Sequence, residues 1–120
     1  MRRLTVDLAG RPYDIHIGPG LLDRLGEFTR PLRPSRLLVV TDARVGPLYA
    51  ARARAALQAV APTTVFELAG GETGKDMRAI EAVLDALLAD GADRRSVVVA
   101  LGGGVIGDIA GFAAAIYMRG

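Results

Sequence analysis

The sequence predicts an α/β fold in which a parallel sheet is covered by helices on both faces. Short runs of aliphatic and β-branched residues alternate with longer segments whose apolar positions recur at helical spacing. Two of the runs are almost continuously apolar, as expected of strands buried on both faces of a parallel sheet. Strands that alternate with helices of ten or more residues form right-handed βαβ crossovers.

The N-terminal segment predicts a β-hairpin followed by a short helix. Apolar and polar residues alternate over residues 4–8 and again over residues 13–17, with a Gly-Arg-Pro turn signal at residues 10–12. After a Gly-Pro-Gly break at residues 18–20, leucine and phenylalanine recur at helical spacing over residues 21–28.

The remaining segments predict three strands and three helices in alternation. The strands are expected at residues 36–42, 63–68 and 96–101, and the first and last of these are the continuously apolar runs. The helices are expected at residues 46–60, from residue 77 to the C-terminal glycine at position 91, and at residues 105–118.

Composition narrows the function classes. With 120 residues, 51% of them hydrophobic and 23% charged, the chain has the composition of one soluble globular domain. The 15 Lys and Arg residues are scattered and the net charge is +2, which argues against nucleic acid as a partner. No cysteine is present for a disulfide or thiolate site. Neither a secretory signal nor a membrane span is evident, so we expect a cytoplasmic location and no membrane partner.

The strongest chemical signal is a glycine-rich turn at residues 102–104, between the last strand and the last helix. Glycine lets the backbone approach a phosphate closely, and the free N–H groups of a helix's first turn point at a bound anion. A pyrophosphate cradle and a tight structural turn explain this pattern about equally well. Asp108 follows, and its carboxylate is suited either to capping the helix or to hydrogen bonding with ribose or nicotinamide.

Two further loops follow strands and should emerge at the same edge of the sheet, where α/β proteins bind ligands. The segment Gly70-Gly71-Glu72-Thr73-Gly74-Lys75 offers phosphate and sugar contacts, although a solvated loop that caps the next helix is the simpler interpretation. Asp42 ends its strand and is suited either to adenosine ribose or to helix capping. The single histidine, His16, alternates with apolar hairpin residues and is a poor metal-ligand candidate.

The stretch from Gly102 to Ala115 reads GGGVIGDIAGFAAA and is followed by Tyr-Met-Arg-Gly; it resembles the signature of 3-dehydroquinate synthases. The Gly-Glu-x-x-Lys segment at residues 71–75 and the Val-Val-Thr-Asp strand end at residues 39–42 stand where that family contacts NAD. The resemblance covers residues 1–120 and implies a Rossmann-like parallel sheet with an N-terminal β-hairpin. It corresponds to the family's N-terminal NAD-binding domain, before the metal-binding helical domain.

The resemblance also implies roles for individual residues. Asp42 corresponds to the adenosine-side acid, Asp108 to the acid near the nicotinamide, and Arg119 to an arginine that reaches the phosphorylated substrate. The remaining implied NAD contacts are Gly70, Gly71, Glu72, Thr73, Gly74, Lys75, Gly103, Gly104, Val105, Ile106 and Gly107. No residue within 1–120 is implied as a metal ligand or assigned a catalytic role.

The implied reaction is the NAD- and metal-dependent conversion of 3-deoxy-D-arabino-heptulosonate 7-phosphate to 3-dehydroquinate and phosphate. It is a lyase reaction of the shikimate pathway, in aromatic amino acid biosynthesis. The family's metal is zinc or cobalt, held by the helical domain, and the family implies a homodimer at full length. We therefore expect the 120-residue chain alone to be inactive. Alternatives are another sugar-phosphate cyclase, of the 2-deoxy-scyllo-inosose or valiolone type, or a non-catalytic nucleotide-binding module.

Overall fold

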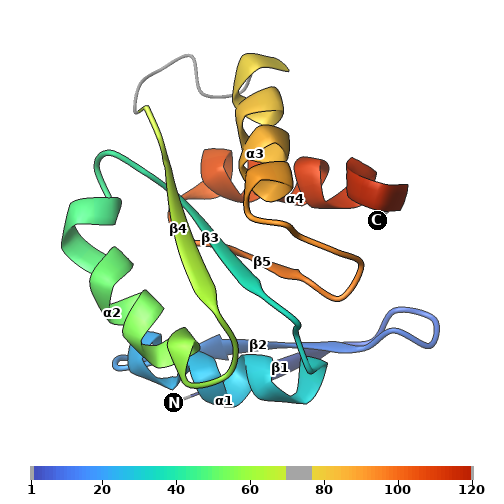
Figure 1. Ribbon diagram of the computed structural model, residues 1–120. Helices are drawn as coiled ribbons and strands as arrows, with labels where there is room; N and C mark the ends of the chain where they lie inside the picture. The colour runs from blue at the N-terminus through green and yellow to red at the C-terminus, as the bar shows by residue number, and fades with distance from the viewer. Residues whose placement is uncertain (1, 70–76, 120) are drawn as a thin grey trace.

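The fold follows from a computed structural model, which describes residues 2–69 and 77–119 (Figure 1). In chain order the strands and α-helices are β1 (Arg2–Val6), β2 (Tyr13–Ile17), α1 (Leu25–Thr29), β3 (Leu37–Asp42), α2 (Gly46–Gln58), β4 (Thr63–Leu68), α3 (Met77–Ala89), β5 (Val97–Ala100) and α4 (Gly104–Ile116). Three single-turn 3₁₀ segments lie at Leu22–Arg24, Arg30–Leu32 and Tyr117–Arg119. The α/β class predicted from the sequence is confirmed.

The central sheet has three parallel strands in the order β4-β3-β5. Leu37 pairs with Thr63 of β4 on one side and with Val97 of β5 on the other. The central strand β3 is buried from Leu37 to Thr41, as its continuously apolar sequence predicts. The expectation that β5 is equally buried is wrong: its valines are half-buried, because β5 lies at an edge of the described sheet.

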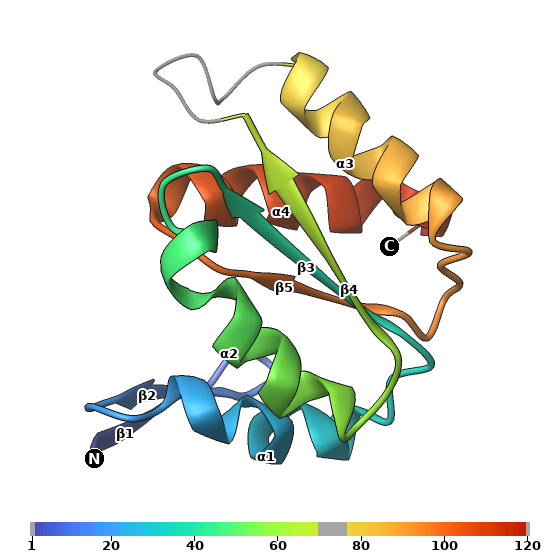
Figure 2. The same cartoon turned by 60° about the vertical axis from the view of Figure 1, so that its left-hand side comes forward.

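Helices cover both faces of this sheet (Figures 1 and 2). On one face α2 packs on the strands and α1 packs on α2, around a core cluster of Leu37, Val39, Leu57 and Ala61. On the other face α3 and α4 enclose a larger cluster whose buried members are Leu38, Val40, Leu68, Val83, Leu87, Ala92, Ile106, Ile109, Ala110 and Ala113. The alternate residues of β3 therefore supply both cores, as the period-two geometry of a strand requires.

The N-terminal hairpin is separate from the central sheet. Strands β1 and β2 pair antiparallel, with Leu4 opposite Ile15. The predicted first strand at residues 4–8 is shifted, since β1 ends at Val6. On the side toward α1, the ring of His16 stacks on Phe28 with centroids 4.3 Å apart, and Nδ1 of His16 is buried without a hydrogen-bond partner among the described residues.

Two helix predictions need correction. The segment 21–28 is not one helix, because the α1 turn is flanked by 3₁₀ turns and Pro31 follows it within the second of these. The final helix, expected to reach residue 118, ends at Ile116. Tyr117 has extended φ and ψ angles, and its hydroxyl donates a hydrogen bond of 2.8 Å to the carbonyl of Ala92. Met118 then adopts a left-handed conformation with φ of 47°.

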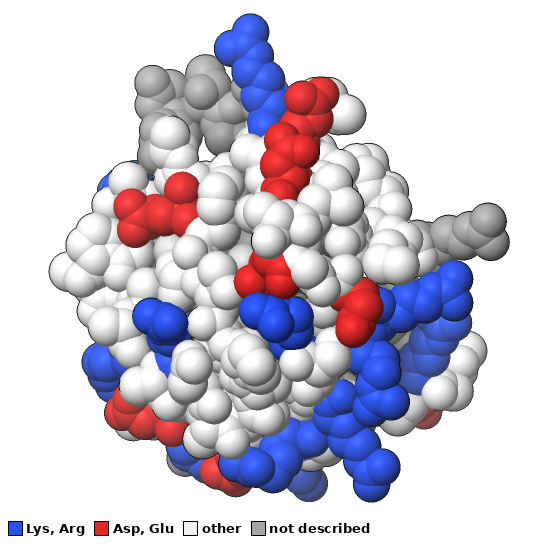
Figure 3. All heavy atoms as spheres, in the orientation of Figure 1, with Lys and Arg blue, Asp and Glu red and all other residues white. Residues whose placement is uncertain are grey.

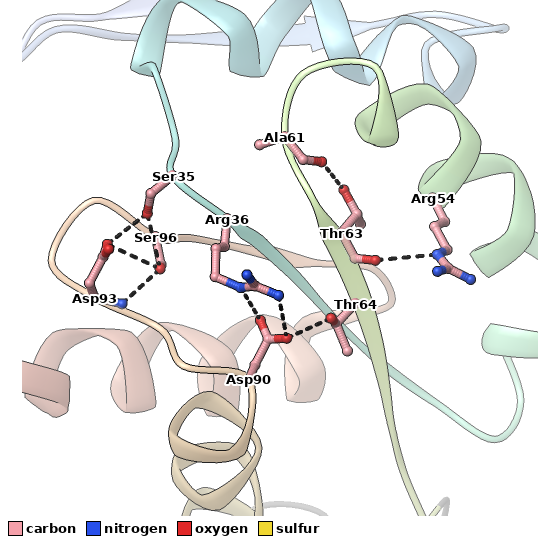
Figure 4. Close-up of polar contacts among 9 residues, drawn as sticks. All are labelled: Ser35, Arg36, Arg54, Ala61, Thr63, Thr64, Asp90, Asp93 and Ser96. Carbon is pink, nitrogen blue, oxygen red and sulfur yellow. Dashed lines mark hydrogen bonds and ion pairs between the residues drawn. The ribbon is translucent and has the colours of Figure 1, made fainter.

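Polar side chains fasten the loops at the amino-terminal edge of the sheet (Figure 4). Asp90, at the end of α3, accepts a hydrogen bond of 2.7 Å from Thr64 and pairs with Arg36 at 3.3 Å. Nearby, Asp93 accepts a hydrogen bond of 2.6 Å from the Ser35 hydroxyl. The contacts of Asp90 with Arg36 and of Asp93 with Ser35 join segments that lie more than fifty residues apart in the chain, away from the edge where ligands are expected.

The Asp93 cluster predicts a pH-dependent contribution to stability. The hydrogen bond from Ser35, together with the backbone N–H of Arg95, lowers the pKa of Asp93. A lowered folded-state pKa stabilises the fold above the ordinary aspartate pKa of about 4, and this stabilisation is lost as the pH falls through the folded-state value. We expect Asp93→Asn to lower the melting temperature at pH 7 slightly, and the difference from the parent to disappear near pH 2.

A matched control for this prediction is Asp85→Asn, at an exposed position on α3. Thermal unfolding followed by circular dichroism between pH 2 and pH 7 compares both variants with the parent chain. A melting temperature of Asp93→Asn that stays below the parent's by the same amount at every pH would contradict the assignment.

Candidate nucleotide-binding site

The candidate site lies where β3 and β5 end side by side. Because the strands are parallel and adjacent, the loops that follow them emerge at the same edge of the sheet. The N–H of Leu101 donates a hydrogen bond of 2.9 Å to the carbonyl of Val40. The hydroxyl of Thr41, which is fully buried, donates one of 2.7 Å to the carbonyl of Leu101. The glycine turn is thus attached to the end of β3 by two hydrogen bonds.

The turn itself leads directly into α4. Gly102 has φ of +157°, and a β-carbon there would lie 3.0 Å from the side chain of Ile106, so this position requires glycine. Gly103 is the N-cap residue of α4 in an extended conformation, and no side chain caps the helix there. The first-turn N–H groups of the helix therefore lack a capping side chain and point outward from the turn.

Two glycines of this turn are not explained by contacts within the chain. A β-carbon at Gly103 or Gly104 would meet nothing within 4 Å. Neither residue has a positive φ, so neither packing nor backbone conformation demands glycine at these positions. What glycine does provide is space in front of the amino terminus of α4. That space and the uncapped amides fit the pyrophosphate of a dinucleotide.

Asp42 has a structural role at the end of β3. Its Oδ1 atom accepts hydrogen bonds from the backbone N–H of Arg44 at 2.9 Å and of Val45 at 2.8 Å, just before α2. These bonds close the turn before α2 and do not cap the helix, whose N-cap residue Val45 has no side-chain cap, so the capping alternative for Asp42 is wrong. The other carboxylate oxygen, Oδ2, forms no hydrogen bond with the described residues and is available to a ribose hydroxyl.

Glu67 is a second acid at this edge, and the sequence did not single it out. Its carboxylate lies against Gly46, the first residue of α2: a β-carbon at Gly46 would collide with Glu67 Oε2 and lie 3.1 Å from Cδ. Glu67 is exposed and forms no hydrogen bond or ion pair with the described part of the chain. Its position one residue before the end of β4 was the available signal.

The predicted residues on α4 separate into two groups. Val105 and Asp108 are exposed to solvent. Asp108 lies beyond the first turn of α4, which contains no acidic residue, and this position argues against its capping interpretation. The side chain of Ile106 lies in the core with 4% of its surface exposed, which leaves only its backbone for a ligand.

Several predicted residues lie outside the described residues. They are the whole segment Gly70, Gly71, Glu72, Thr73, Gly74 and Lys75. The backbone of Arg119 ends the last 3₁₀ turn, whereas its side chain is not described. The structure therefore places Asp42 at the same edge of the sheet as the glycine turn and the start of α4. It does not test the predictions for residues 70–75 or for the side chain of Arg119.

The rest of the surface was searched for charge clusters, metal-ligand groups and membrane-spanning helices. Arginine side chains gather toward the lower right of Figure 3, near the hairpin and the loop before β5, away from the glycine turn. In the part of the chain that the structure describes, no three His, Cys, Asp or Glu residues are grouped so that they could hold a metal ion. Nor does any helix there have the length and apolar character needed to cross a membrane.

Comparison with known proteins relates this geometry to an enzyme family. A family model described as the N-terminal part of 3-dehydroquinate synthase matches residues 65–120. The 3-dehydroquinate synthase of Laribacter hongkongensis is 49% identical over 122 residues, which cover 100% of this chain and 34% of that enzyme. By sequence, the chain is a relative of the 3-dehydroquinate synthases. It spans about a third of the length of the 3-dehydroquinate synthases that it matches.

Solved structures of related cyclases share the fold. The crystal structure of 2-deoxy-scyllo-inosose synthase complexed with carbaglucose-6-phosphate, NAD+ and Co2+ superposes with a TM-score of 0.89 at 25% identity, over 99% of this chain and 33% of that one. The 2-epi-5-epi-valiolone synthase from Streptomyces hygroscopicus subsp. jinggangensis 5008, with NAD+ and Zn2+ bound, gives 0.74 at 33% identity, over 95% and 32%. The Rossmann-like sheet and the N-terminal hairpin are thus those of the sugar-phosphate cyclases.

The hydrogen bond between β3 and the glycine turn provides a test of the site in this relative of 3-dehydroquinate synthase. We expect Thr41→Val, which removes the hydroxyl and keeps the shape, to lower the unfolding free energy by about 1–3 kcal/mol, because the Leu101 carbonyl loses its partner. The loosened turn should also weaken NAD binding several-fold.

Thr41→Ser is the matched control, since it keeps the hydroxyl. Urea unfolding and a fluorescence titration with NAD compare the three proteins. If Thr41→Val and Thr41→Ser behave alike, the methyl group and not the hydrogen bond is what matters at this position.

Proposed function

We propose that this chain is the NAD-binding part of a 3-dehydroquinate synthase. The observation that carries the proposal is the open turn at Gly103 and Gly104, in front of uncapped helix amides and attached to the end of β3. Sequence identity of 43–50% with 3-dehydroquinate synthases supports the assignment, as do the NAD+-bound cyclases of the same fold. The corresponding reaction is a lyase reaction of aromatic amino acid biosynthesis, in the cytoplasm.

Within this proposal, different residues bind different parts of the dinucleotide. The first-turn amides of α4 and the backbone at Gly103 and Gly104 hold the pyrophosphate. Asp42 Oδ2 accepts from the adenosine ribose, while its Oδ1 remains bound to the loop before α2. Asp108 lies farther along α4, toward the nicotinamide. The segment 70–75, between β4 and α3, wraps the dinucleotide with Glu72 and Lys75 as polar contacts.

The proposed reaction also needs a substrate-binding residue and a metal ion. Arg119 binds the phosphate of 3-deoxy-D-arabino-heptulosonate 7-phosphate, a role suited to a planar fork of donors. A divalent metal, zinc or cobalt, is held by a helical domain outside residues 1–120, and the full-length enzyme is a homodimer. When bound, NAD supplies a transient oxidation of the substrate and is regenerated, so the domain binds and orients it. The 120-residue chain alone does not turn over.

A second candidate is a cyclase that closes a different ring. It is favoured by the fold neighbours, which are 2-deoxy-scyllo-inosose and valiolone synthases. These two synthases are 25% and 33% identical to this chain, whereas the Laribacter hongkongensis 3-dehydroquinate synthase is 49% identical. The higher identity supports the first candidate.

A chimeric enzyme tests the proposal directly. The chain replaces the matching N-terminal third of the Laribacter hongkongensis synthase, and phosphate release from 3-deoxy-D-arabino-heptulosonate 7-phosphate is measured in the presence of NAD. We expect turnover, and we expect Arg119→Ala in the chimera to lower kcat/KM by about 100-fold, the range for removing a charged contact, with NAD affinity unchanged.

Two results would count against these assignments. A chimera that folds and binds NAD but releases no phosphate contradicts the proposed synthase activity. An Arg119→Ala chimera with the kcat/KM of its parent removes Arg119 from the substrate site.

A further inference from the structure

Tyr117 ends α4 and attaches that end of the helix to another segment of the domain. Its backbone N–H donates a hydrogen bond to the carbonyl of Ala113, four residues earlier, as in the helix itself. Its hydroxyl donates the 2.8 Å hydrogen bond to the carbonyl of Ala92, in the loop between α3 and β5. The ring packs against the core cluster enclosed by α3 and α4. The end of α4 is therefore fixed to a loop twenty-five residues earlier in the chain (Figure 2).

The carbonyl that accepts the Tyr117 hydroxyl is itself held in place. Helix α3 ends in a Schellman motif, in which the N–H of Ala92 donates to the carbonyl of Leu87 at 3.0 Å and the N–H of Gly91 to that of Leu88 at 3.1 Å. Gly91 has the positive φ, 73°, that this motif requires. Ala92 and Leu87 are both buried in the same core cluster. The carbonyl of Ala92 is therefore a fixed anchor for Tyr117.

The residue after Tyr117 has a backbone conformation that its own side chain does little to stabilise. Met118 has φ of 47° and ψ of 36°, in the left-handed region that residues other than glycine rarely adopt. Met118 is 47% exposed, so burial of its side chain gives little compensation. Such a conformation persists where neighbouring residues determine it, and the neighbour Tyr117 is anchored. The reversal at Met118 sets the direction in which the chain carries Arg119, whose backbone ends the last 3₁₀ turn.

We propose that Tyr117 is a positioning residue for substrate binding: through its hydrogen bond to Ala92 it fixes the end of α4 and thereby directs Arg119 toward the phosphorylated substrate. This inference rests on the proposed function, in which Arg119 binds the substrate phosphate. The hydroxyl of Tyr117 is engaged by Ala92 and takes no part in the chemistry. Recognition of a phosphate by the planar guanidinium depends on its direction, so a small displacement of the backbone that carries Arg119 weakens the contact.

The anchor at Tyr117 lies far from the proposed pyrophosphate site. Helix α4 has 13 residues and is therefore about 20 Å long, with the glycine turn at one end and Tyr117 at the other. Loss of the Tyr117 hydrogen bond should accordingly weaken substrate binding and leave NAD affinity unchanged. A general loosening of the domain would weaken the binding of both ligands.

Substrate binding by the chimera with the Laribacter hongkongensis synthase tests the inference. Tyr117→Phe removes the hydroxyl and keeps the ring. We expect it to raise the KM for 3-deoxy-D-arabino-heptulosonate 7-phosphate about 10-fold, with kcat and NAD affinity within about 2-fold of the parent. Calorimetry on the NAD-loaded chimera without metal measures substrate affinity independently of turnover, and this affinity should fall by the same factor.

Two comparisons separate positioning from stability. Thr64→Val removes a hydroxyl hydrogen bond of 2.7 Å to Asp90, near the same edge of the sheet. We expect it to lower the melting temperature of the chimera as Tyr117→Phe does, but to leave KM at the parent value. In the Arg119→Ala chimera, Tyr117→Phe is expected to cause no further loss of substrate affinity, because the two residues act through one contact.

Parental substrate affinity in Tyr117→Phe, alongside a loss in Arg119→Ala, would overturn the inference. So would an equal loss from Tyr117→Phe with and without Arg119, since Tyr117 would then act on another group. Parental affinity in Arg119→Ala would remove both the inference and the proposed role of Arg119. A chimera that shows the expected binding pattern but does not turn over would support the inference and contradict the proposed synthase activity.

Discussion

Replacing Gly104 by valine is expected to weaken NAD binding by at least about 100-fold, equivalent to about 2.7 kcal/mol, while the domain stays folded. A β-carbon at this position meets nothing within the domain, so the branched side chain enters the space in front of the α4 amides without disturbing the core. The pyrophosphate is then held away from those amides. Calorimetric titration with NAD and circular dichroism measure the two effects separately.

Gly111→Val is the matched control in the same 120-residue chain. It makes the same substitution on the same helix, also into open space, but two turns away from the amino terminus of α4. Its NAD affinity should equal that of the parent. If Gly104→Val retains full affinity, the glycine turn is structural and the pyrophosphate has been placed wrongly.

The largest effect on stability is expected at Leu57. Its side chain is fully buried in the cluster between α2 and the sheet, where it packs with Leu37 and Val39. Leu57→Ala removes buried apolar surface and leaves a cavity, so the free energy of unfolding should fall by about 2–5 kcal/mol. That loss is a large fraction of the roughly 5–15 kcal/mol total of a domain this size.

Leu48→Ala is the control on the same helix. Leu48 is 68% exposed, and its replacement should change the unfolding free energy by about 0.5 kcal/mol or less. Urea denaturation of both variants provides the comparison. Similar losses at the two positions would mean that α2 does not pack on the sheet as described.

The sequence predicted the parts of the fold that depend on local patterns. The continuously apolar residues 36–42 correctly indicated a strand buried on both faces, and β4 has the predicted bounds. The burial of β5 was not predictable in this way, because it depends on which strand lies at the edge of the sheet. The end of α4 was missed because Tyr117 is held by a hydrogen bond to Ala92, twenty-five residues earlier in the chain.

The site shows the same division. Chain order alone placed Asp42 and the glycine turn at one edge of the sheet, and the structure confirms that placement. Chain order could not show that Asp42 Oδ1 is bound to the loop before α2, because the sequence was compatible with two roles for this residue. Glu67 was missed because its proximity to Gly46 arises from the pairing of β4 with β3, not from a motif.

The most direct test of the account is calorimetric titration of the purified 120-residue chain with NAD, with circular dichroism to establish that it is folded. We expect saturable binding at one site per chain, because the turn after β5, Asp42 and the amino terminus of α4 are all in place. A folded chain that gives no saturable heat with NAD would contradict the claim that this domain builds the dinucleotide site.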